Sequence, residues 1–168
     1  MKMCGWLAIG VAWSLAVGCS TPPAPSAVVS GEGRVSPFLM FQDGNAEAAM
    51  DFYVSVFPDS RVVSVERHGA GAPAAEGQIE MGTFEIMGQQ VRCSDSPPVH
   101  DFDFTPSMSL YVVCTSEAEL DGYAARLSEG GGFMMPPGDY GFSQRFAFLK
   151  DRYGVSWQLN LPNERGGG

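Results

Sequence analysis

Basic residues are scarce in this chain. Lys and Arg together number ten among 168 residues, they form no cluster, and the formal net charge is −9. A nucleic-acid surface needs Lys and Arg to neutralise phosphates, so this composition argues against a nucleic-acid partner. Only two histidines are present. His68 ends an expected strand and His100 lies in a Pro-rich connector beside Asp101 and Asp103, and neither position is typical of a metal-ligand set.

A hydrophobic run long enough to span a bilayer comfortably is also missing. The apolar run Trp6–Val17 follows Met1-Lys2, and it is shorter than the roughly 20 residues of a membrane-spanning helix. Residues 1–19 therefore read as an export signal. The run ends in Leu15-Ala16-Val17-Gly18-Cys19, which resembles the lipobox of bacterial lipoproteins, where the Cys carries the lipid. An ordinary cleaved signal and an uncleaved anchor are the alternatives.

These features predict an exported protein held to a bacterial membrane by a lipid on Cys19. Ser20, in place of Asp, favours the outer membrane or the periplasmic face. Residues 20–36 are rich in Pro, Ala, Ser and Gly and lack an apolar face, so we expect a flexible linker. The folded domain then covers residues 37–162, and residues 163–168 form a disordered tail.

Cysteine is infrequent, with four residues in the chain. Cys4 is lost with the signal and Cys19 would carry lipid, which leaves Cys93 and Cys114 in the domain. Export to an oxidising compartment makes a disulfide conceivable. Both residues lie in expected strands, however, where Cys often serves as a small apolar filler. The sequence leaves both readings open.

A strand, cap and helix pattern occurs twice, 70 positions apart. The ungapped match pairs Phe38 with Met108, and it pairs the helix face Met50, Tyr53, Val54, Phe57 with Leu120, Tyr123, Ala124, Leu127. The spacing predicts two modules, 37–95 and 106–162, each with the order βαβββ. The fold class is α+β.

Turn and cap residues set the expected boundaries. Asn45 is expected to cap the first helix, which ends at Phe57-Pro58 because Pro disfavours helical geometry in the preceding residue. Ser116, with Glu119 three residues later, predicts a capping box for the second helix. A hairpin turn is expected at Met87-Gly88, and a strand over residues 107–114.

The order of these motifs resembles the vicinal oxygen chelate superfamily, which includes glyoxalase I and extradiol dioxygenases, and within it the PhnB-like branch, labelled 3-demethylubiquinone 3-methyltransferase-like. The resemblance implies two modules whose curved, cupped mixed sheet surrounds a pocket, with the helices on the convex side. One fold of this kind hosts many reactions. The matching segments are Pro37–Phe41, Asp43–Ala49, Phe52-Tyr53, Phe57–Ser60, Phe84–Gln89 and Leu149–Leu159.

The resemblance also implies four metal-ligand positions, which fall on Phe38, Arg92, Met108 and Gln158. Phe and Met do not hold a hard divalent cation, and Arg carries the wrong charge. We therefore expect no metal. The methyltransferase label implies S-adenosylmethionine, but no glycine-rich turn joins a parallel strand to a helix, so we expect no cofactor either.

Strand alternation indicates which side chains face the pocket. The polar run of Ser156, Gln158 and Asn160 is typical of a ligand site rather than of a sealed core. An inward Arg92 needs an anion, either Glu80, Glu85 or an acid group of a ligand. The predicted ligand-pocket residues are Phe38, Met40, Gln42, Arg92, Met108, Leu110, Ser156, Gln158 and Asn160.

Two functions follow from different classes. The first is a metal-free domain that binds a small organic molecule, which is anionic if Arg92 pairs with it. The second is a metal-dependent enzyme of the vicinal oxygen chelate type, such as a lyase, isomerase or dioxygenase, with ligands at other positions. A pocket filled by its own side chains is a further reading. Relatives of this fold often form homodimers, but the sequence leaves the oligomeric state open.

Overall fold

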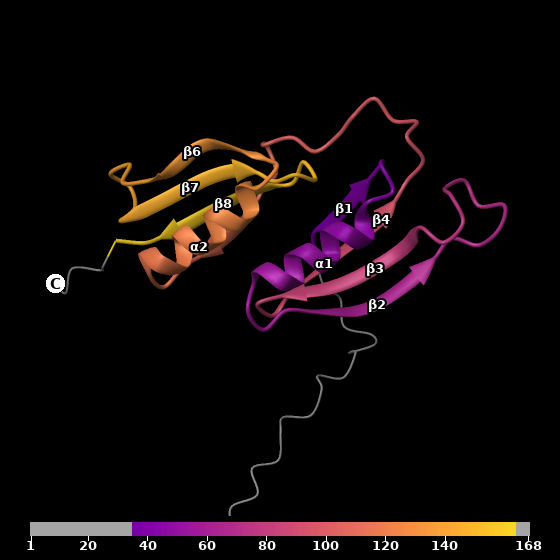
Figure 1. Cartoon of the computed structure of the whole chain (residues 1–168), viewed down its shortest axis with the longest axis horizontal. Coiled ribbons are helices and arrows are strands. Elements are labelled where there is room, and N and C mark those ends of the chain that lie inside the picture. Colours follow the sequence, from indigo (N-terminus) through magenta and orange to yellow (C-terminus); the bar gives the residue numbers. More distant parts are fainter. Residues whose placement is uncertain (1–34, 164–168) are drawn as a thin grey trace, which may run out of the picture. The chain divides into compact units, whose positions relative to one another are not determined.

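The computed structural model describes residues 35–163, which fold into two modules of the same element order (Figure 1). The first module contains β1 (Phe38–Phe41), α1 (Ala46–Val56), β2 (Arg61–Arg67), β3 (Ile79–Ile86) and β4 (Gln89–Asp95). The second contains β5 (Leu110–Val113), α2 (Glu117–Ser128), β6 (Gly132–Gly138), β7 (Arg145–Lys150) and β8 (Ser156–Leu161). The predicted α+β class with two βαβββ modules is confirmed.

The predicted export signal, its Cys19, nearly all of the linker and most of the tail lie outside the described residues. Within the described range, α1 has 11 residues and α2 has 12. No described helix is long and apolar enough to cross a membrane.

Each module forms a four-stranded mixed sheet, with strand orders β1-β4-β3-β2 and β5-β8-β7-β6. The β1–β4 and β5–β8 pairs are parallel and the other pairs are antiparallel. Each helix covers one face of its own sheet (Figure 1). The apolar faces expected from helical periodicity are buried, with Met50 and Tyr53 in α1 and Leu120, Tyr123, Ala124 and Leu127 in α2.

The N-terminus of α1 is capped from a distant strand. Asn45 makes no side-chain cap bond. Asp95 instead accepts hydrogen bonds from the backbone N–H of Ala46 and of Ile79, both at 2.9 Å. Asn45 occupies the predicted N-cap position, but the expected cap by its side chain is not made. β4 pairs beside β1 and brings the buried Asp95 carboxylate to the first amide of the helix instead.

The cap of α2 and the hairpin turn follow the sequence closely. The Ser116 hydroxyl accepts a hydrogen bond from the Glu119 N–H at 3.2 Å, which confirms the predicted N-cap. Met87 and Gly88 join β3 to β4 with φ angles of 48° and 84°. Two successive left-handed residues are the geometry of a tight hairpin turn, so the predicted turn is confirmed.

The register of β5 differs from the ungapped internal match. Phe38 lies opposite Arg92 in the first sheet, whereas Tyr111 lies opposite Gln158 in the second. Tyr111, not Met108, is thus the counterpart of Phe38. Fewer residues join the first strand to the helix in the second module. The strands of the two modules therefore match at a different sequence spacing from the helices.

Asp151 joins the two modules. Its buried carboxylate, 2% exposed, accepts hydrogen bonds from the Tyr53 hydroxyl of α1 and from the Trp157 indole N–H, both at 2.8 Å. The backbone N–H groups of Tyr153 and Val155 also donate to it, at 2.8 and 3.1 Å. Burial raises the pKa of Asp151, while these four hydrogen bonds favour its charged form and oppose the rise.

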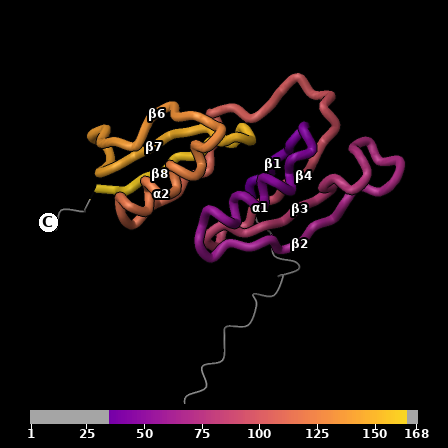
Figure 2. The backbone as a smooth tube through the Cα atoms, in the orientation of Figure 1, coloured from indigo at the N-terminus to yellow at the C-terminus, as the bar shows by residue number. Residues whose placement is uncertain are grey.

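Aromatic packing and backbone contacts reinforce this joint. Phe57 stacks on Trp157 with ring centroids 5.2 Å apart, and the Arg126 guanidinium donates to the Ser55 carbonyl at 2.7 Å. The buried side chains of both modules form one continuous core. A long connector without helix or strand carries the chain from β4 to β5 (Figure 2).

Cys93 and Cys114 are both buried and free, so the structure contains no disulfide between them. Burial raises the pKa of the Cys93 thiol to about 12 and that of the Cys114 thiol to about 11. Because the thiolate is the reactive form, both residues serve as apolar filler rather than as reactive groups.

The joint at Asp151 yields a first prediction. Tyr53→Phe removes one donor from a buried carboxylate, and we expect it to lower the free energy of unfolding by about 1.5–3 kcal/mol. Tyr153→Phe is the matched control, because that hydroxyl donates to the exposed Ala48 carbonyl, and its loss should stay under about 1 kcal/mol. Urea unfolding at neutral pH measures both. Equal losses in the two variants would contradict a special role of Asp151.

Candidate functional site

A groove along the edge strand β5, here called the β5 groove, is larger than the two other cavities described below. Its volume is about 440 Å³ and its walls are mainly apolar. Because it combines residues of both modules, it exists only when the two modules are packed together. Its lining is Val35, Pro37, Ile86, Met87, Gln89, Val91, Met108–Val113 and Trp157.

A smaller cavity, here called the serine pocket, has a volume of about 190 Å³. The segment Met108–Leu110 forms a wall of both the serine pocket and the β5 groove, so the two cavities adjoin one another. The serine pocket is lined by Leu39, Asp103, Phe104, Thr105, Met108–Leu110, Val155 and Ser156.

Ser156 is the unusual member of the serine pocket. The residue is 2% exposed, and its hydroxyl has no hydrogen-bond partner among the described residues. Such a group costs about 1–3 kcal/mol of stability. Buried polar atoms are normally satisfied, so a hydroxyl without a partner on a residue beside a cavity needs an explanation.

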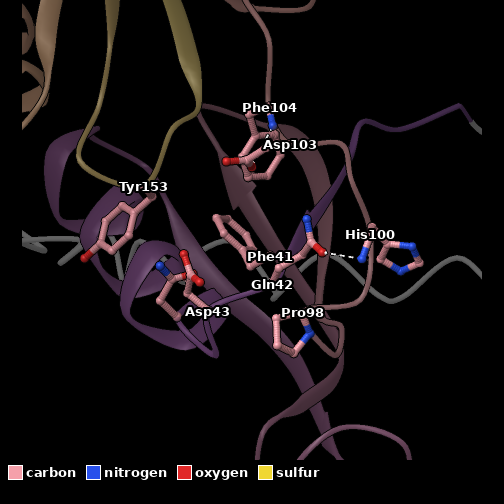
Figure 3. A pocket seen from close by; sticks show the side chains of 9 residues that line it. Phe41, Gln42, Asp43, Pro98, His100, Asp103, Phe104 and Tyr153 are labelled. Atoms are coloured by element: carbon pink, nitrogen blue, oxygen red, sulfur yellow. Dashed lines mark hydrogen bonds between the residues drawn. The ribbon is translucent and has the colours of Figure 1, made fainter.

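The third cavity, of about 200 Å³, lies beside the connector (Figure 3). Gln42 fastens the connector here: its amide donates to the Phe102 carbonyl at 2.6 Å and accepts from the His100 N–H at 3.1 Å. Phe104 packs edge-on against Phe41, with ring centroids 5.2 Å apart. Gln42 is one of the predicted ligand-pocket residues, and through these two hydrogen bonds it holds the connector between the modules.

Phe38, Met40 and Arg92 lie on the open face of the first sheet and line none of these three cavities. Phe38 is 49% exposed, and Arg92 is its neighbour on β4. Glu85, one of the internal partners considered for Arg92, forms an ion pair with Arg61 at 2.5 Å. Within residues 35–163 no ion pair involves Arg92, so its guanidinium is open to solvent.

The face of the second sheet also differs from the prediction. Leu110 lies opposite Trp157, so it points toward the helix side, and Met108 precedes β5. Tyr111 and Val113, both more than half exposed, share the face of Gln158. The predicted facing of Leu110 is therefore wrong, although Met108, Leu110 and Ser156 do meet in the serine pocket.

Gln158 and Asn160 are both engaged within the protein. The Gln158 amide donates to the Ser109 hydroxyl at 2.7 Å. Asn160 is 8% exposed and its side-chain carbonyl accepts from the buried Ser143 hydroxyl. Asn160 is thus sealed by the loop before β7, whereas Gln158 orients a serine that lines two cavities.

The four metal-ligand positions that the resemblance implies can be placed from the register. They are Phe38, Arg92, Tyr111 and Gln158, the opposed pairs of β1–β4 and β5–β8. None of these side chains is a carboxylate or an imidazole, so they do not fit a hard divalent cation. In the described part of the chain, no group of three or more His, Cys, Asp or Glu residues could hold a metal ion.

Sequence reasoning finds three residues of the serine pocket, Met108, Leu110 and Ser156, and misses the others. Phe104 comes from the Pro-rich connector and Ser109 from the expected strand over residues 107–114. The two aromatic residues of Phe102-Asp103-Phe104 were the available signal that the connector packs against the domain, because aromatic rings favour burial.

Ser156→Ala provides a second prediction. Removing an unsatisfied buried hydroxyl should leave the free energy of unfolding unchanged or raise it by up to about 1 kcal/mol. Ser143→Ala is the control, because that buried hydroxyl has a partner in Asn160, and its loss should cost about 1 kcal/mol. Thermal and urea unfolding report both. A clear loss of stability in Ser156→Ala would show that the hydroxyl is already satisfied by the protein.

Comparison with known proteins gives the family. The family model "3-demethylubiquinone-9 3-methyltransferase" matches residues 33–160. A solved structure described as a putative 3-demethylubiquinone-9 3-methyltransferase, PhnB protein, from Bacillus cereus is 46% identical, with a TM-score of 0.73 over 77% of this chain and 99% of that chain. Among proteins with curated descriptions, none matches this chain significantly.

More distant structures share the fold. A glyoxylase/bleomycin resistance protein/dioxygenase domain from Frankia sp. is 15% identical, with a TM-score of 0.56 over 80% of this chain and 100% of that chain. A fosfomycin resistance protein from Listeria monocytogenes, complexed with Mn(II), is 16% identical, with a TM-score of 0.53 over 76% of this chain and 90% of that chain. The chain therefore belongs to the 3-demethylubiquinone-9 3-methyltransferase (PhnB-like) family and has the glyoxalase/bleomycin resistance/dioxygenase fold.

Proposed function

We propose that this protein is a metal-free binding domain for a small organic molecule, exported and anchored to a bacterial membrane through a lipid on Cys19. The observation that carries the binding role is the β5 groove. Its volume of about 440 Å³ lies within the range of small-molecule sites, and its mostly apolar walls with a few polar groups are typical of them.

The groove walls suit an adaptable site. Met87 and Met108, on opposite modules, are 43% and 59% exposed. Thioether side chains are flexible and polarizable, so they adjust to ligands of different shape. Tyr111 adds an exposed ring, 57% exposed, that can stack on a flat ligand.

Neither methyl transfer nor metal catalysis is part of this proposal. β1 leads to α1 through Gln42-Asp43-Gly44-Asn45, which contains one glycine rather than a glycine-rich phosphate-binding turn. The Mn(II)-bound neighbour shares only the fold with this chain. Of the four implied metal-ligand positions, Phe38 and Arg92 offer no ligand atom for a divalent cation, and Tyr111 and Gln158 offer only a phenol and an amide.

A thermal-shift screen of small neutral, aromatic and anionic compounds tests the binding role and the part of Arg92. A ligand at about 100 times its Kd stabilises the fold by about 2.7 kcal/mol, which raises the Tm by several degrees. If an acid group meets the free guanidinium, Arg92→Ala should weaken anionic hits roughly tenfold and leave neutral hits unchanged. Arg61→Ala is the charge-matched control on the same face.

Two results would contradict this account. Equal protection of the wild type and Arg92→Ala by every anionic hit would show that the Arg92 guanidinium, which lies outside the cavities, holds no acid group. A stoichiometric divalent ion in protein purified without chelators would overturn the metal-free proposal and favour a metal-dependent enzyme with ligands at other positions.

Membrane fractionation of the protein expressed in a bacterial host tests the anchor. Acyl chains on Cys19 should place the wild type in the membrane fraction, because each buried methylene contributes about 0.8 kcal/mol. Cys19→Ser should shift most of the protein out of that fraction. Cys4→Ser is the control, since Cys4 would be removed with the signal. Membrane retention of Cys19→Ser would indicate an uncleaved anchor instead.

A further inference from the structure

Two serines, at the start of the adjacent strands β5 and β8, line the serine pocket. Leu110 lies opposite Trp157 in the parallel β5–β8 pair, so the preceding residues, Ser109 and Ser156, stand at the same end of this pair. Both line the pocket. The Ser109 hydroxyl accepts from the Gln158 amide at 2.7 Å, and its own hydrogen is left to donate.

The hydroxyl hydrogen of Ser156 is likewise available, because the group has no partner within the described residues. Two serines of adjacent strands with a free O–H hydrogen therefore line the pocket; the Ser156 oxygen itself is buried, so its side chain must rotate toward the cavity to reach a ligand. A carbonyl oxygen has two lone pairs and accepts such donors well. Gln158 acts here through Ser109, which it orients, so it is a positioning residue for the pocket.

The rest of the lining indicates the charge of the ligand. Leu39, Phe104, Met108, Leu110 and Val155 give the pocket an apolar wall. Its lining contains no Lys, Arg or His, and its one ionisable residue is Asp103. A negatively charged end would lie near a carboxylate without any compensating cation, which is unfavourable in a partly desolvated cavity.

The other hydroxyl of the lining is already engaged. Thr105 and Ser107 share a hydrogen bond of 2.6 Å within the connector. The Asp103 carboxylate accepts from the Phe104 N–H at 2.7 Å. Thr105 and Asp103 are thus bonded within the connector, whereas Ser156 has no partner among the described residues and Ser109 only accepts, from Gln158.

We infer that the serine pocket holds the neutral carbonyl end of the ligand, a ketone, ester or amide, while its apolar remainder extends along Met108–Leu110 into the β5 groove. This inference rests on the proposed binding function and specifies the chemical class of its ligand. Ser156 and Ser109 are the hydrogen-bonding residues, and Leu39 and Phe104 enclose the adjoining carbon atoms.

The test compares three probes of similar size on the full chain: acetophenone, ethylbenzene and benzoate. Calorimetry or ligand-observed NMR measures the Kd of each. Acetophenone should bind about two- to tenfold more tightly than ethylbenzene, the contribution of a satisfied hydrogen bond, and benzoate should bind most weakly.

Ser156→Ala should remove the preference for acetophenone and leave ethylbenzene binding unchanged. Ser94→Ala is the matched control, because Ser94 lies on the open face of the first sheet and lines none of the three cavities. This variant should keep the wild-type preference among the probes.

The outcomes separate the two proposals. If acetophenone and ethylbenzene bind alike, or if Ser156→Ala leaves their ratio intact, the carbonyl inference is wrong while the binding function stands. Tightest binding of benzoate would also overturn it. If none of the three probes binds at millimolar concentration, both the binding function and the inference fall.

Discussion

The buried carboxylate of Asp151 is the interaction on which the arrangement of this domain depends. A desolvated charge is costly unless every lone pair meets a donor, and here Tyr53, Trp157 and two backbone amides supply those donors. Tyr53 comes from the first module and the other three from the second. Satisfying one carboxylate therefore fixes α1 against the turn between β7 and β8.

The positions of the residues that line the cavities depend on this joint. Val155 donates its N–H to Asp151 and is followed directly by Ser156. The alternation of β8 then turns Trp157 into the core and leaves Ser156 in the serine pocket. Leu39, from the first module, closes the same pocket. A site assembled from two modules in this way stays formed only while the joint holds.

Membership in the family fixes the fold of this chain more firmly than its chemistry. The four metal-ligand positions that the resemblance implies carry an aromatic ring, a guanidinium, a phenol and an amide here. The same framework therefore has groups suited to hydrogen bonding and stacking, and a groove suited to an apolar ligand. Arg92 remains a free cation on an open face, because Arg61 already engages Glu85.

The sequence by itself determined the two modules, because the same pattern recurs 70 positions apart. It also determined the buried helix faces, the α2 cap and the hairpin turn, because each depends on neighbours within a few positions. It also indicated the polar run of Ser156, Gln158 and Asn160. It could not determine that Asp95 caps α1, since the partners are 49 positions apart. Nor could it determine the register of β5, which differs from the ungapped internal match because fewer residues join β5 to α2 than join β1 to α1.

Only the tertiary structure decided which predicted residues meet. Met108, Leu110 and Ser156 come together in one pocket, Gln42 clamps the connector, and Arg92 stands apart from the cavities. Ser109 and Phe104 joined the site without a local signal that was recognised. Local periodicity assigns a side chain to a face, but a cavity depends on how distant segments pack, and that packing is set here by the joint at Asp151.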